Sequence, residues 1–213
     1  EPQVCTRDGK PGSGIVNPER CETWSDPHRT LLGRAQEQWL DQAFAKAGGG
    51  ATWNVVGQQT LFGRRDFRVG PGASLWNDGW DGYGAARDRF TTALQKHRLA
   101  NPVLLGGDVH ENWVGHVKAD YARPDSAALG VEFCGTSITS RAGASEKFAE
   151  RLAENPHFLF ADNQRKGYGV VDFTPGQLTT TLRVVDDVTR KNTQIGTLAR
   201  FVVQAGRPVV ESA

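Results

Sequence analysis

Asp108 and His110 are candidate metal ligands because they directly follow a run of apolar residues. Residues 101–110 read Asn-Pro-Val-Leu-Leu-Gly-Gly-Asp-Val-His. In open α/β sheets, ligands bind at the carboxyl ends of the strands. If this segment is extended, alternation places both side chains on one face, where a carboxylate oxygen and an imidazole nitrogen can share a metal ion. The two-residue match leaves an alternative open, in which Asp108 caps the turn and His110 makes a local hydrogen bond.

Several better-defined catalytic motifs are absent. His110 and Glu111 begin a match to the zinc-peptidase motif His-Glu-x-x-His, but its fifth position is Val114, and His116 lies too far along the chain for that helical geometry. The sequence has no Gly-x-Ser-x-Gly elbow, no Gly-x-x-x-x-Gly-Lys-[Ser/Thr] loop and no Cys-x-x-Cys pair. The simplest zinc-peptidase, serine-hydrolase, nucleotide-hydrolase and zinc-ribbon interpretations are therefore excluded.

The composition indicates a globular protein with one sizeable core. The chain has 213 residues, 38% of them apolar, and its 25 Lys and Arg nearly cancel its 24 Asp and Glu. Because nonspecific nucleic-acid binding depends on clustered positive charge, we expect no nucleic acid as a structural partner. No apolar run approaches the roughly 20 residues that cross a bilayer, so we expect no membrane span.

The elements expected before Asp108 suggest a parallel crossover. Apolar residues recur at helical spacing over 30–47, a short strand is expected within 52–62, and a second helix over 85–99 leads into the strand before Asp108. This order of strand, loop, helix and strand fits a parallel βαβ unit. The aromatic-rich segment 63–84 is too irregular for a helix or strand, and such long loops in compact domains are usually functional.

The second half of the chain is predicted to be rich in β-structure. The predicted strands lie within 112–121, 129–139, 167–174, 178–188 and 197–204, with one helix near 145–154. No repeat or linker divides the chain. We therefore interpret 1–213 as a single α/β unit that is β-rich toward the end, with 1–29 as a loop and 30–213 as the folded part.

Cys5 and Cys21 bracket the polar, Gly- and Pro-rich loop at the start of the chain. This placement favours a disulfide and hence an oxidising compartment; two free thiols in a cytosolic protein are the alternative. Cys134 lies among β-forming residues and is predicted to be a buried thiol.

Five segments, in order, resemble the carboxyl-terminal half of the PhoD-like alkaline phosphatases, members of the calcineurin-like metallophosphoesterases. They are DPHRTLLGRAQEQWL, WDGYGAARDRF, VLLGGDVHENW, VEFCGTSITS and NPHFLFADNQRKGYGVVDFTP. Together they cover nearly the whole chain from about Asp26. The resemblance implies an αββα sandwich with metal ligands on loops at the strand ends, and hydrolysis of phosphate monoesters and diesters.

The resemblance also implies roles for particular residues. Asp108 and His110 become two ligands of a bimetal site, with iron and calcium as the implied metals; hard oxygen ligands suit calcium and a mixed donor set suits iron. In the family the other ligands come from the amino-terminal half. We therefore expect that half as a missing partner, a phosphate ester as substrate, and a secreted or periplasmic location. The alternative is an inactive fragment or a non-catalytic binding module.

Nine further residues are weaker candidates for this site: Trp80, Asp81, Tyr83, His116, Asn155, His157, Asn163, Arg165 and Lys166. The "WDGY" residues could line a substrate cleft, although aromatic residues in a structured loop also serve packing. The asparagines could contact phosphate or form turns, and the histidines could support metal ligands or be structural. The two cations could attract phosphate or be solvated surface.

Overall fold

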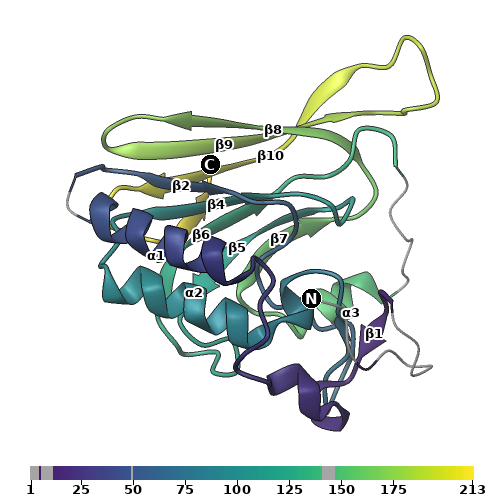
Figure 1. The fold of residues 1–213 in the computed structure, drawn as a ribbon. Helices are drawn as coiled ribbons and strands as arrows, with labels where there is room; N and C mark the ends of the chain where they lie inside the picture. The colour runs from purple at the N-terminus through teal and green to yellow at the C-terminus, as the bar shows by residue number, and fades with distance from the viewer. Residues whose placement is uncertain (1–4, 6–11, 49, 141–146) are drawn as a thin grey trace.

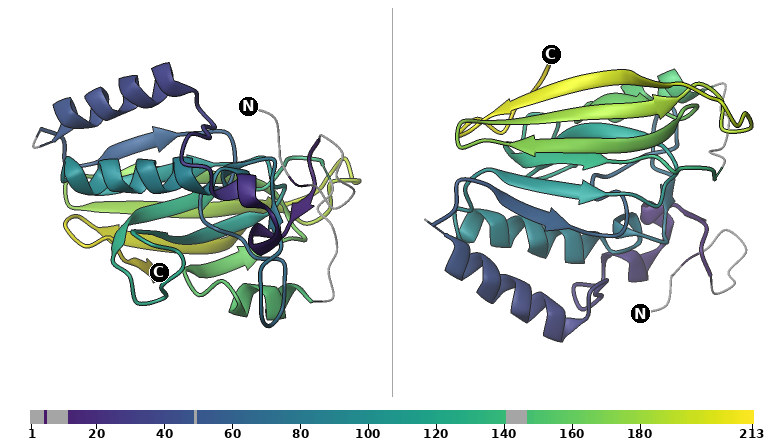
Figure 2. Two further views of the ribbon diagram at one scale, coloured as in Figure 1. Left: turned by 60° about the horizontal axis from the view of Figure 1, so that its bottom comes forward. Right: turned by 90° about the horizontal axis from the view of Figure 1, so that it is seen from above.

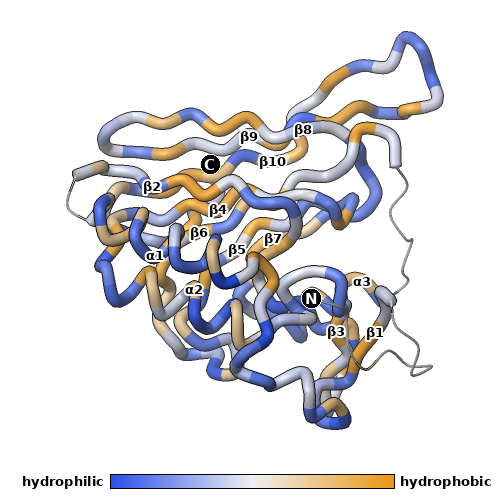
Figure 3. The backbone as a smooth tube through the Cα atoms, in the orientation of Figure 1, coloured by the Kyte–Doolittle hydropathy of each residue, from blue (hydrophilic) through white to orange (hydrophobic). Residues whose placement is uncertain are grey.

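Two β-sheets pack face to face, and two helices cover the outer face of the larger sheet (Figures 1 and 2). The structure is a computed structural model and describes residues 5, 12–48, 50–140 and 147–213. Figure 3 shows apolar residues running along the strands of both sheets.

The larger sheet has five strands in the order β2-β4-β6-β5-β7. They are β2 (Asn54–Gly57), β4 (Pro102–Gly106), β6 (Ala128–Cys134), β5 (Asn112–Lys118) and β7 (Phe158–Asp162). Strands β2, β4 and β6 are parallel, whereas β5 runs antiparallel to both of its neighbours. The parallel crossover predicted from the sequence is confirmed by the pairing of β2 with β4.

The smaller sheet is antiparallel in the order β11-β10-β9-β8. Its strands are β8 (Lys166–Phe173), β9 (Gln177–Val185), β10 (Ile195–Gln204) and β11 (Val210–Ser212). Burial alternates along β9, so that Leu178 and Leu182 face inward. They pack against Val103 and Val114 of the larger sheet, which closes the sandwich core.

Helices α1 (Arg34–Ala47) and α2 (Gly84–Lys96) cover the opposite face of the larger sheet (Figure 1). Along β4, Val103 faces the sandwich core, while Leu104 packs with Phe44 and Phe90 of the helices. Burial on both faces explains why this strand has a continuous apolar run.

Helix α1 differs from its prediction in its start and in its buried face. It begins at Arg34 because Gly33 has a φ of 81°, outside the helical region. Trp39, one of the apolar residues at helical spacing within 30–47, is 63% exposed. Ala35 is also exposed, so Phe44 is the fully buried residue of this helix.

The remaining elements are short. They are β1 (Ile15–Val16), β3 (Leu75–Trp76), α3 (Phe148–Ala153) and the 3-10 turns η1 (Pro18–Arg20), η2 (Glu22–Ser25) and η3 (Trp80–Gly82). Strand β1 pairs with β3, so the predicted loop 1–29 contains a strand; β7 and β11 were also not predicted. The predicted disulfide between Cys5 and Cys21 is confirmed. Residues 145–146 of the predicted third helix lie outside the described residues.

The predicted β-rich α/β sandwich is confirmed. The described residues form two β layers and one helical layer, and α3 lies with β1 at one end of the molecule (Figure 1). Within these residues, no helix is long and apolar enough to span a bilayer.

Candidate active site

Asp108 and His110 lie in a tight turn just after β4. Their φ angles are 68° and 61°, and the Val109 amide donates to the Gly107 carbonyl at 2.8 Å. The extended geometry that we expected for this segment is therefore wrong: a turn, and not strand alternation, presents the two side chains. Both residues are exposed. Left-handed backbone at residues other than glycine is uncommon and is often found at functional sites.

Two donors hold the backbone of His110. The Lys166 Nζ donates to the His110 carbonyl at 2.8 Å, and the Thr136 hydroxyl donates to the same oxygen at 3.0 Å. Lys166 is only 7% exposed, so its interpretation as solvated surface is wrong. Arg165, by contrast, is exposed and lies 3.9 Å from the Asp162 carboxylate.

A cavity of about 520 Å³ opens in front of this turn, and both Asp108 and His110 line it. Arg65 also lines it and donates to the Glu111 carboxylate at 2.8 Å. The Trp113 indole donates to the same carboxylate oxygen at 2.8 Å. The cavity wall beside His110 therefore contains Glu111 with Arg65 and Trp113 hydrogen-bonded to it.

A buried charge network positions Arg65. The Asp81 carboxylate accepts from the Arg65 amide at 2.9 Å and from the Arg87 guanidinium at 2.5 Å. Glu132, 1% exposed, accepts from the amides of Phe62 and Gly63 just before this segment. Burial raises the pKa of Glu132 to about 7, although the two amides favour its charged form.

Glu132 and Arg87 were not among the residues predicted for this site. The sequence contains a signal for Glu132, which is a carboxylate within the apolar part of β6. A charged residue that is buried in a strand needs specific partners.

Trp80, Asp81 and Tyr83 are buried and do not line the cavity at Asp108. The Trp80 indole donates to Gln58 at 3.0 Å, and its ring packs on Phe62 with centroids 4.8 Å apart. These contacts favour the packing alternative, and a direct substrate contact stays a prediction.

Asn155 and His157 line a different cavity, of about 340 Å³. The Asn155 side chain accepts from the Asp66 amide at 2.8 Å and donates to the Asp66 carbonyl at 2.9 Å. The His157 Nε2 donates to the Arg64 carbonyl at 2.7 Å, and burial lowers the pKa of its imidazole to about 3. Both side chains support the loop that carries Arg65, and their role in substrate binding stays a prediction.

His116 and Asn163 also lie away from this cavity lining. The His116 Nε2 accepts from the Val210 amide at 3.3 Å and so bridges the two sheets. Asn163 is buried just after β7. The structural alternative is favoured for His116.

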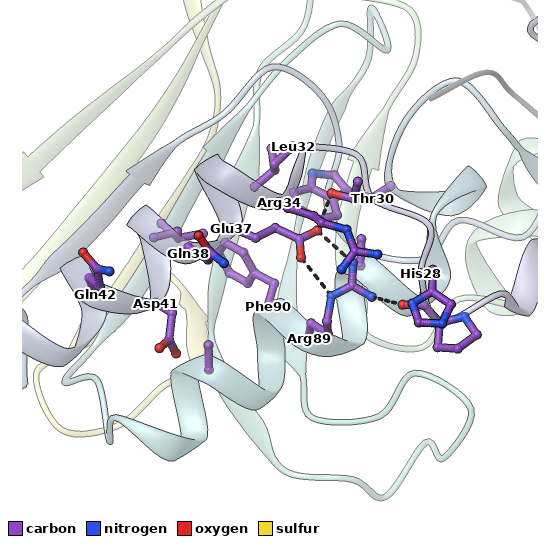
Figure 4. Close-up of a pocket in the computed structure, with 15 residues that line it drawn as sticks. His28, Thr30, Leu32, Arg34, Glu37, Gln38, Asp41, Gln42, Arg89 and Phe90 are labelled. Atoms are coloured by element: carbon purple, nitrogen blue, oxygen red, sulfur yellow. Dashed lines mark hydrogen bonds and ion pairs between the residues drawn. The ribbon is translucent and has the colours of Figure 1, made fainter.

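A third cavity, of about 450 Å³, lies between α1 and α2 (Figure 4). Its Glu37 accepts from Arg89 at 2.8 and 2.9 Å and from Thr30 at 2.5 Å. Burial opposes ionisation of Glu37, but these hydrogen bonds outweigh it and lower its pKa. Neither Asp108 nor His110 lines this pocket, so we do not interpret it as the active site.

Asp108 and His110 fit part of a metal coordination shell. They offer a carboxylate oxygen and an imidazole nitrogen, donor types that suit calcium and iron. No group of three His, Cys, Asp or Glu side chains that could hold a metal ion occurs in the part of the chain that the structure describes. Cys134 is 1% exposed and burial raises its pKa, which disfavours the thiolate that a metal would require.

Comparison with known proteins connects this arrangement to a family. Residues 3–182 match the family described as PhoD-like phosphatase. The chain belongs to the PhoD-like phosphatase family. It is 40% identical, over 182 residues, to alkaline phosphatase D of Bacillus subtilis (strain 168). The aligned region covers 84% of this chain and 31% of that protein.

A solved structure described as "Structure of PhoD" matches the fold with a TM-score of 0.87 and 34% identity. The match covers 99% of this chain and 40% of the solved one. This PhoD-like chain therefore spans well under half the length of both relatives.

Proposed function

We propose that this chain supplies part of the active site of a phosphoesterase that hydrolyses phosphate monoesters and diesters. The supporting observation is that Asp108 and His110 line one cavity at the end of β4. They do so in a chain that is 40% identical to alkaline phosphatase D.

In this proposal Asp108 and His110 hold the metals that the family resemblance implies, iron and calcium. Such metals polarise phosphoryl oxygens and lower the pKa of bound water. Lys166 and Thr136 orient His110 through its carbonyl, since both donate to that oxygen. Arg65 is paired with Glu111 at 2.8 Å and so gives the cavity wall a fixed ion pair.

The remaining ligands come, in this proposal, from the segment that corresponds to the rest of the relatives' length. The disulfide between Cys5 and Cys21 supports an oxidising compartment, so we propose a secreted or periplasmic location. The second candidate function is a non-catalytic fragment or binding module. It is favoured because the described residues contain no group of three His, Cys, Asp or Glu side chains that could hold a metal ion.

The deciding experiment substitutes Asp108→Ala in the protein that contains this chain together with that segment. Removal of a metal ligand should lower kcat/KM for a phosphate ester by at least about a hundredfold and reduce bound metal, measured by elemental mass spectrometry. Asp125→Ala, in the exposed loop between β5 and β6, is the matched control. Unchanged activity and metal content in the Asp108 variant would contradict the ligand role, and a metal-free, inactive parent would favour the binding module.

A further inference from the structure

Arg151 of α3 lines the cavity that contains Asp108 and His110, and among the described residues no carboxylate forms an ion pair with it. Its guanidinium carbon lies 5.6 Å from the centroid of the Phe67 ring. The Nε atom is buried and has no hydrogen-bond acceptor within the described part of the chain. A buried guanidinium nitrogen without an acceptor is costly unless a ligand satisfies it.

Arg65 provides the contrast within the same cavity. Its guanidinium carbon lies 4.6 Å from the centroid of the same Phe67 ring, but it is neutralised by Glu111 at 2.8 Å. Two arginines thus stack on one aromatic ring, and among the described residues only Arg65 has a carboxylate partner. Of the cations that line this cavity in the described part of the chain, Arg151 is therefore the one without a carboxylate partner.

The cavity has room for more than a phosphoryl group. Its volume of about 520 Å³ falls within the range of about 300–1,000 Å³ that is typical of sites for drug-sized ligands. Four aromatic side chains line it: Phe67, Trp76, Trp113 and Phe148. Aromatic walls bind flat apolar groups through stacking and edge contacts. The part of the ester beyond phosphorus therefore has a surface to bind, with Arg151 beside it.

The backbone of Arg151 is also held in place. The Asn155 side chain bonds to both backbone groups of Asp66, next to Phe67, and donates to the Arg151 carbonyl at 2.7 Å. This clamp ties α3 to the loop that carries Phe67. When the backbone that carries a cation is already fixed, less conformational freedom is lost on binding.

We propose that Arg151 is a specificity-determining residue that binds an anionic group on the leaving-group side of the ester, next to a flat apolar portion stacked on the aromatic wall. This inference rests on the proposed phosphoesterase function. It leaves the bond cleavage itself unchanged, because Arg151 contacts the part of the substrate remote from phosphorus.

The test uses two aryl phosphates that differ in one charge, 4-carboxyphenyl phosphate and 4-carbamoylphenyl phosphate. In Arg151→Met, kcat/KM for the carboxylate ester should fall about tenfold or more, mainly through KM, because a charge-assisted hydrogen bond is lost. The carboxamide ester should change less than about twofold. Arg151→Lys should recover part of the loss, and Arg190→Met, in the exposed turn between β9 and β10, is the control.

Each other outcome has a defined meaning. Equal losses for both esters would overturn the proposal, since Arg151 would then act on the phosphoryl group or on folding, which thermal unfolding checks. No change for either ester would overturn it as well. If the unmodified enzyme cleaves neither ester, the proposed function fails. The role of Arg151 is then tested by calorimetric binding of 4-carboxyphenylphosphonate to this chain. Equal affinity of the unmodified chain and of Arg151→Met for this phosphonate would overturn the inference.

Discussion

Glu132 is a fully buried carboxyl whose protonation is coupled to the stability of the protein. Its oxygens accept from the Phe62 and Gly63 amides, yet burial raises its pKa from 4.5 to about 7. The folded state therefore binds more protons than the unfolded state between these two pH values. The stabilisation is fully present below about pH 4.5 and is lost as the pH rises through about 7.

We predict that Glu132→Gln removes this pH dependence. The free energy of unfolding of the unmodified chain relative to the variant should fall by about 1–3 kcal/mol between pH 5 and pH 8. Chemical denaturation at several pH values measures it. The difference between the two proteins is needed because His157, whose pKa burial lowers to about 3, titrates in the opposite sense. A pH-independent difference would show that Glu132 has an ordinary pKa.

At the residue scale, Asp108 and His110 could be predicted from the sequence, but the residues that hydrogen-bond to the backbone of His110 could not. These two residues are predictable because they are polar and directly follow an apolar run. A cation next to a glycine is typical of solvated surface, but folding buries Lys166 against the His110 carbonyl. Contacts between residues 56 positions apart depend on how the two sheets stack, which no local pattern encodes.

At the scale of elements, the clamp at Asn155 joins α3 to the loop before β3. Asn155 is 2% exposed, and its amide group bonds to both backbone groups of Asp66. Helix α3 has only six residues, too short to be stable by itself, so its position depends on such contacts.

We predict that Asn155→Ala lowers the free energy of unfolding by about 2 kcal/mol or more, because buried backbone groups lose their partners. It should also weaken the preference for the carboxylate ester, since Arg151 is no longer held. Denaturant unfolding and kcat/KM for the two aryl phosphates measure these effects. Asn192→Ala, in an exposed turn, is the control; a stability loss equal to that of the control would contradict the clamp.

The elements that the sequence predicted well are those with a strong period or a long apolar run, such as α2 and β4. Short elements were missed when their partners are distant: β1 has two residues and pairs with β3 about sixty positions away. The start of α1 was misplaced because Gly33 interrupts an otherwise helical pattern.

At the scale of the whole molecule, both the larger and the smaller sheet have an edge strand with an exposed apolar side chain. Strand β2 is an edge of the larger sheet, where Val55 is 46% exposed, and β8 is an edge of the smaller sheet, where Val170 is 40% exposed. Exposed edges with apolar side chains promote pairing with other chains. The chain covers 31% of alkaline phosphatase D and 40% of the solved PhoD chain, so we propose that the corresponding remaining segment covers these edges.

We therefore predict that this chain by itself self-associates, and that Val55→Lys with Val170→Lys makes it more monomeric, because lysine on an edge strand opposes pairing. Light scattering after size-exclusion chromatography measures the mass. With the remaining segment co-expressed, the unmodified chain should form a one-to-one complex, and the lysine substitutions should weaken it. Lysine at Val188, exposed in the turn after β9, is the matched control, since it adds charge without blocking an edge. If the unmodified chain stays monomeric at high concentration and does not bind the added segment, these edges do not pair with another chain. That result would favour the binding-module alternative over an active site divided between two segments.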